Sequence, residues 1–147
     1  GSIWTGPSTF TTSPGPHPFP LTEDFESGFT YFDNTSGNDV DFADETTLFH
    51  GGSHSVHNAY SPSNSNILHE TGILDLSGTS SAILEFWQIA KTEGGWDKCF
   101  IEISTDGGAS YTAFPGAAYQ GTGSGYGPAG YFDEDDYTEW GTGDDTP

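Results

Sequence analysis

The sequence predicts an all-β fold, an antiparallel β-sandwich, and two observations lead to it. The 147-residue chain is rich in glycine (21) and proline (9) and also in phenylalanine (11) and tyrosine (7), a composition that suits short strands joined by tight turns. Apolar residues recur in short alternating runs bounded by Gly, Pro, Asn or Ser, the pattern of half-buried strands. Helices are expected to be scarce.

The domain organisation follows from length and composition. With 32% hydrophobic residues the chain has enough apolar material for one modest core, and too little for two domains. Residues 1–20 carry four prolines between Pro14 and Pro20, which predicts an extended linker or a strand-edge arm. Residues 21–147 are expected to form the sandwich module.

Three short β segments are expected in the first half of the module. They are LTEDFES (21–27), VDFAD (40–44) and SHSVHNAY (53–60). Each is bounded by a cluster of turn-forming residues. Their regular spacing favours a sandwich.

The second half contains the clearest pair of predicted strands. SAILEFWQIA (81–90) and DKCFIEIS (97–104) both alternate with apolar residues on each face, as central strands require. A hairpin follows, because Asp106-Gly107-Gly108 supplies the positive backbone angles of a tight turn.

The end of the chain is expected to be irregular. Residues 116–130 are dominated by glycine, and the last seventeen residues are strongly acidic. We therefore expect a glycine-rich and acidic loop region over 116–147, with one strand near 137–140.

The charge balance excludes whole classes of function. The formal net charge is -20, and Lys91 and Lys98 are the only basic residues, so nucleic acids and anionic lipid surfaces would be repelled. No apolar run is long enough to cross a membrane. A hard cation with oxygen ligands would relieve the self-repulsion locally, which makes calcium the expected cofactor.

Six motifs in order resemble one family: DFESGF, NDVDF, GGSHSVH, ILHETGILDLSG, AILEFWQ and FIEISTDGGASYTAF. Together they span Leu21 to Phe114 and are similar to secreted bacterial jelly-roll modules of the MAM-like and cleaved-adhesin type. The resemblance implies an antiparallel sandwich with jelly-roll, galactose-binding-like topology, a structural calcium site, no catalytic residues and an extracellular or cell-surface location. It also implies further strands beyond Asp144 and Asp145, so the chain is expected to be either a fragment of the module or one that another chain completes by adding strands to an open edge.

The predicted calcium ligands are Glu26, Asp39, Asp41 and Asp97. The Asp39-x-Asp41 spacing places two carboxylates on one face of an extended segment. Glu26 belongs to the same sandwich edge in the family's pattern, and Asp97 opens a predicted central strand. The alternative is that these acids form only a solvated face.

Other metal and catalytic sites are disfavoured. His54 and His57 would point to opposite faces of a strand, and no cysteine or acid cluster stands near them at zinc-ligand spacing. The single Cys99 has no activating base, and no hydrolase motif is present. The sequence therefore predicts a protein that is not an enzyme.

Exposed aromatic residues are the expected ligand-binding groups. Trp96, Tyr126 and Tyr131 fall in predicted loops, where aromatic rings can stack on sugar rings or anchor a protein partner. The expected function is a non-catalytic extracellular binding or adhesion module that recognises a glycan or a surface protein. The alternatives are a carbohydrate-binding accessory module, and a structural subunit of a surface filament or layer completed by strands from a neighbouring chain.

Overall fold

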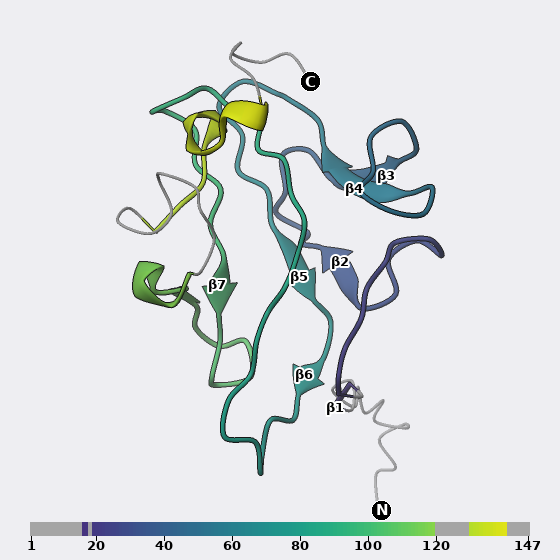
Figure 1. Cartoon of the computed structure of the whole chain (residues 1–147), viewed down its shortest axis with the longest axis vertical. Coiled ribbons are helices and arrows are strands. Elements are labelled where there is room, and N and C mark those ends of the chain that lie inside the picture. The colour runs from purple at the N-terminus through teal and green to yellow at the C-terminus, as the bar shows by residue number, and fades with distance from the viewer. Residues whose placement is uncertain (1–15, 18, 120–129, 141–147) are drawn as a thin grey trace, which may run out of the picture. The chain divides into compact units, whose positions relative to one another are not determined.

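The computed structural model describes residues 16–17, 19–119 and 130–140 (Figure 1). Within these residues the regular structure consists of short strands and three 3₁₀ helices, with no α-helix. The prediction of a β-rich chain is therefore confirmed. The strands are β1 (Pro16–His17), β2 (Phe32–Asn34), β3 (Phe42–Glu45), β4 (Ser55–Asn58), β5 (Leu68–Glu70), β6 (Ile73–Leu74), β7 (Glu102–Ile103) and β8 (Thr112–Ala113).

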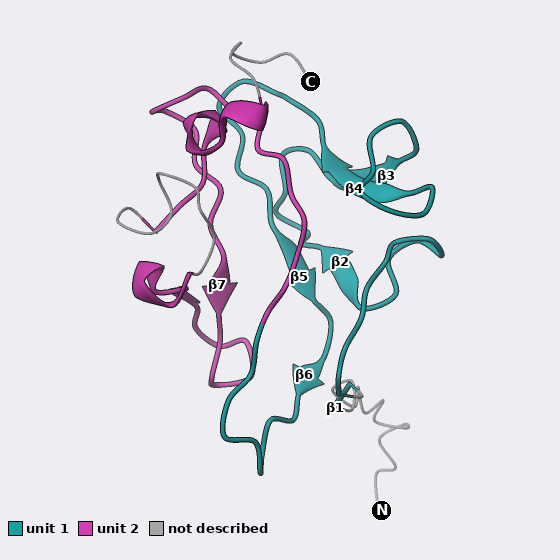
Figure 2. Ribbon diagram, in the orientation of Figure 1, with its two compact units in different colours: residues 1–83 teal, residues 84–147 magenta. Residues whose placement is uncertain are grey.

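The strands pair only two by two. The four sheets are β1–β6, β2–β5, β3–β4 and β7–β8. The sheets of the described residues are thus small and two-stranded, and the sandwich with jelly-roll topology stays a prediction. The chain divides into two compact units, residues 1–83 and 84–147, which Figure 2 shows in different colours.

Unit 1 (1–83) contains three of the sheets. The β3–β4 pair is antiparallel, with Phe42 opposite Asn58, and β2–β5 is antiparallel with Phe32 opposite Glu70. β1, which falls within the predicted linker or arm, pairs in parallel with β6. The His17 Nε2 atom also lies 3.0 Å from Glu70 Oε1.

The loop before β2 is organised by one carboxylate. Glu23 Oε2 accepts hydrogen bonds from the N–H groups of Thr30 (2.9 Å) and Tyr31 (2.8 Å), and Oε1 accepts from Phe25 N–H (3.1 Å). Phe25 has a positive φ of 59°, an uncommon conformation for a side chain of this size. The stretch 21–27 is a folded loop and not the predicted strand, since Phe25 N–H bonds to the Glu23 side chain and Glu26 N–H bonds to Asp24 Oδ1 at 3.1 Å.

Unit 2 (84–147) contains the predicted hairpin. β7 and β8 are antiparallel with Ile103 opposite Thr112, which confirms the turn at 106–108. An isolated antiparallel bridge joins Cys99 to Phe132, with two backbone hydrogen bonds of 2.8 Å. Phe132, 1% exposed, and Ala90, 4% exposed, form the centre of a small core. Other residues pack against it, namely Cys99, Ile101, Phe114, Tyr119, Tyr137 and Trp140.

Two predicted strands of unit 2 are absent from the described sheets. Residues 81–90 belong to none of the four sheets. Thr138–Trp140 forms a 3₁₀ helix rather than a strand. The prediction for 137–140 was wrong because Trp140 N–H bonds to the carbonyl of Tyr137, closing a helical turn.

Candidate functional site

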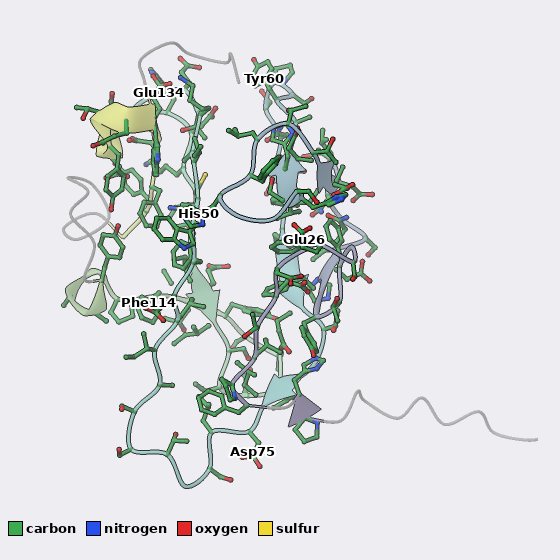
Figure 3. All side chains as sticks on the ribbon, turned by 45° about the vertical axis from the view of Figure 1, so that its right-hand side comes forward. Glu26, His50, Tyr60, Asp75, Phe114 and Glu134 are labelled. Atoms are coloured by element: carbon green, nitrogen blue, oxygen red, sulfur yellow. The ribbon has the colours of Figure 1, made fainter. Side chains whose placement is uncertain are left out.

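Glu26 lies in the loop before β2 and forms hydrogen bonds with the segment that precedes β4. Its carboxylate accepts hydrogen bonds from Ser53 N–H (2.8 Å), Ser53 Oγ (2.8 Å) and His54 N–H (2.9 Å). Figure 3 shows Glu26 among the side chains of this part of unit 1. The hydrogen bond from the Ser53 backbone, followed by those from the Ser53 hydroxyl and His54, holds the pKa of Glu26 below its usual value. Glu26 is thus ionised and engaged with protein donors.

The other three predicted calcium ligands are exposed. Asp39 Oδ2 accepts a hydrogen bond from Ser65 N–H at 2.8 Å, and Asp41 lies two residues further on, just before β3. Asp97, in unit 2, accepts a long hydrogen bond from Glu93 N–H, 3.4 Å.

The predicted ligands do not form a preformed metal-binding cluster among the described residues. Among the described residues no group of three or more His, Cys, Asp or Glu side chains is placed to hold a metal ion. Calcium needs six to eight oxygens, so a site built on Asp39 or Asp41 would have to use backbone carbonyls and water as well. The assignment of the four carboxylates to calcium stays a prediction.

A histidine–carboxylate pair lies beside Glu26. His54 Nδ1 is 2.8 Å from Asp44 Oδ1. This hydrogen bond raises the pKa of His54, and the charges of Asp44 and Glu26 act in the same direction. His57 lies in β4 opposite Ala43.

Trp96 lies in a hydrogen-bonded turn of unit 2. The N–H groups of Trp96 and Asp97 both bond to the carbonyl of Glu93, at 3.0 and 2.9 Å. Gly95, with a positive φ of 78°, donates to Asp133 Oδ2 at 3.2 Å. The Trp96 side chain itself is 78% exposed. The turn therefore presents an indole to solvent from an anchored backbone.

Sequence reasoning missed a group of buried acids, one of which, Asp133, bonds to this turn. Asp133, Glu134 and Asp136 are only 7%, 7% and 5% exposed, although they belong to the predicted acidic loop. They begin the 3₁₀ helix Glu134–Asp136, where the Asp133 side chain accepts from Asp135 N–H (3.0 Å) and Asp136 accepts from Asp133 N–H (3.0 Å). The Asp-x-x-Asp spacing is a capping-box pattern and could have signalled this helix start.

The other predicted aromatic ligands differ from Trp96. Tyr131 is half-buried, with the Lys98 ammonium 4.8 Å from its ring centroid and the Phe100 ring 6.1 Å away. Its ring is therefore engaged by a cation–π contact on the protein itself. Tyr126 lies outside the described residues.

Cys99 has no features of a nucleophile. Burial raises the pKa of its thiol, and the negative charges of Asp97 and Asp133 raise it further. A thiol held protonated in this way is a poor nucleophile, and its side chain packs against the Phe132 core.

Comparison with protein-family models, with curated proteins and with solved structures gives no match to this chain. In the described part of the chain, no helix has the length and apolar character needed to span a membrane.

Proposed function

We propose that this chain is a non-catalytic binding or adhesion module of a larger secreted or cell-surface protein. In this proposal its strands belong to an antiparallel β-sandwich with jelly-roll, galactose-binding-like topology. The short strands of the described residues, which contain no α-helix, and the motif order over Leu21 to Phe114 support the fold. The net charge of -20 supports a partner other than nucleic acid or an anionic membrane.

The observation that carries the proposal is the anchored, exposed Trp96. Because the turn holds the backbone of Trp96, ligand binding costs little backbone conformational entropy, and the exposed indole can stack on a sugar ring or fill a pocket of a surface protein. Asp97, exposed beside it, supplies a carboxylate that can accept hydrogen bonds from sugar hydroxyls. A glycan is the partner that this pairing of aromatic ring and acid favours.

The test is glycan-array binding by the full chain, with matched tryptophan variants. Trp96→Ala should abolish binding and Trp96→Phe should retain part of it. Trp87→Ala is the control, because Trp87 is almost equally exposed, 77% against 78%, but lies outside the turn. A blank array for the unmodified chain excludes the carbohydrate-binding function, and equal losses in both alanine variants exclude Trp96 as the specific platform.

Calcium is proposed as a structural ion of the module, with the predicted ligands Glu26, Asp39 and Asp41 all in unit 1, whereas the fourth predicted ligand, Asp97, belongs to unit 2. The support is the scarcity of positive charge: with two lysines against 22 acids, bound cations would relieve repulsion in the folded state. Binding there would require Glu26 to share its carboxylate between the ion and its present hydrogen-bond donors.

A second candidate function is a structural subunit completed by strands from a neighbouring chain. The specific observation that favours it is the apolar segment 81–90, which lies outside every described sheet. Strand addition to such a segment is a common mode of assembly. Hydrogen exchange over a dilution series of the chain alone tests whether neighbouring copies protect the segment.

A further inference from the structure

Residues 84–89 of unit 2 expose apolar side chains on both faces of an extended segment. Leu84 is 60% exposed, Trp87 77% and Ile89 50%, and Phe86 is 43% exposed although its ring also meets Phe132 edge to face at 6.3 Å. The segment is part of the magenta trace in Figure 2. Since it belongs to none of the described sheets, it has the sequence of a central strand and the exposure of an edge strand.

An extended partner segment fits this geometry. A strand laid alongside 84–89 would exchange main-chain hydrogen bonds with it and place its own side chains on both faces. If the partner alternates apolar and basic residues, its apolar side chains would cover Leu84 and Phe86 on one face. The aliphatic stems of its basic side chains would lie along Trp87 and Ile89 on the other face.

The charge of this surface indicates the chemistry of the partner segment. Glu85 is exposed and alternates on the same face as Trp87 and Ile89, and no basic residue lies between 81 and 90. A second copy of the chain would bring another net charge of -20 to the contact, and like charges disfavour that encounter at ordinary salt. A cationic partner is steered toward the same surface.

We propose that residues 84–89 dock an extended segment of a different protein by strand addition, and that this segment alternates apolar residues with Lys or Arg. The inference rests on the second candidate function and specifies its partner. The partner's basic side chain would face Glu85 across the added pair, where opposite charges stabilise strand pairing.

Three synthetic peptides test the chemistry on the full chain. One alternates Val and Lys, the second alternates Ser and Lys, and the third alternates Val and Glu. Only the Val–Lys peptide should protect the backbone amides of 84–89 from hydrogen exchange, by about tenfold at saturating peptide. Protection should fall as salt rises, because the charged part of the attraction is screened.

Matched variants test the role of Glu85. Glu85→Gln should weaken binding of the Val–Lys peptide by about two- to fivefold, the range of a single cross-strand charge pair. Glu102→Gln is the control, since it removes the same charge from an exposed position in β7. Equal effects of the two variants would show only general attraction to an acidic chain and would overturn the assignment.

The remaining outcomes test the proposed basic partner and the second candidate function separately. Equal protection by the Ser–Lys peptide or by the Val–Glu peptide overturns the proposed chemistry. If protection of 84–89 grows with the concentration of the chain alone, a second copy of the chain is the partner. That result supports the second candidate function and overturns the proposal of a cationic partner. Slow exchange of the 84–89 amides at all dilutions without peptide, or no protection of them under any condition, overturns both the cationic partner and the second candidate function.

Discussion

The side-chain amide of Asn38 pairs with the backbone of Ile67 as a neighbouring strand would. Asn38 Oδ1 accepts from Ile67 N–H at 2.7 Å, and Nδ2 donates to the Ile67 carbonyl at 3.1 Å. Asn34 does the same for Phe42, with bonds of 2.8 and 2.9 Å. In unit 1, asparagine side chains thus add hydrogen bonds to backbone groups at the ends of strands.

Asn38→Ala should destabilise unit 1. The substitution removes both bonds to Ile67 and a 3.1 Å bond to Asn34 Oδ1, and each net hydrogen bond contributes about 1 kcal/mol, less where solvent can replace it. We expect the free energy of unfolding in urea to fall by about 1–2 kcal/mol. Asn64→Ala, at an exposed position, is the control. An equal loss at both positions would contradict a specific role for the Asn38 pairing.

The parts of the fold that the sequence predicts are those set by neighbouring residues. Alternation predicted β3 and β4, and Asp106-Gly107-Gly108 predicted the β7–β8 hairpin, because turn chemistry acts over a few residues. The same alternation marked 81–90 as a strand. Periodicity defines the two faces of a strand but not its neighbour, so it could not show that the segment lies outside the described sheets.

The parts of the candidate site that escaped prediction depend on distant partners. Asn38 meets Ile67 at a sequence separation of 29, and Glu26 meets Ser53 at 27. Asp133, which is buried, accepts from Gly95 N–H at a sequence separation of 38. Trp96 was correctly placed in a loop, and the structure adds its anchoring and its exposure.

Gly52→Ala should loosen the loop that Glu26 holds. A Cβ at position 52 would lie 2.2 Å from Glu26 Oε1, and the φ of +72° is strained for alanine. Because the carboxylate must move and give up bonds to Ser53 and His54, we expect a loss of about 1–3 kcal/mol in unfolding free energy.

Gly51→Ala is the matched control for that substitution. A Cβ at position 51 meets nothing within 4 Å. Urea denaturation, with limited proteolysis of the loop 46–54, measures both effects. Equal stability of the two variants would show that Glu26 does not restrain this loop.

Calcium should raise the melting temperature of the chain relative to chelator. An ion that binds only the folded state at 100 times its Kd adds about 2.7 kcal/mol, which corresponds to roughly 5–10 °C for a chain of this size. Asp41→Asn should reduce the shift while leaving the melting temperature in chelator unchanged, since Asp41 is exposed. Asp75→Asn, outside the predicted ligand set, is the control. No shift with calcium would overturn the structural ion.

The hairpin between β7 and β8 should lose stability in acid through Asp106. Hydrogen bonds from the Ser110 hydroxyl (2.6 Å), Ser110 N–H (2.9 Å) and the Ser104 hydroxyl (2.7 Å) lower the pKa of Asp106 to about 2. Because the pKa is lower in the folded state than the ordinary 3.8, the stabilisation is complete above about pH 4 and is lost as the pH falls toward about 2.

Amide exchange in the hairpin, followed by NMR across that interval, measures the effect. The amides of Gly108 and Ser110 should lose protection as Asp106 takes up its proton, since both belong to the hydrogen-bonded turn around Ser104 and Asp106. In Asp106→Asn these amides should be less protected at neutral pH and should change little with acid. A variant that keeps the acid transition would assign it to other carboxylates.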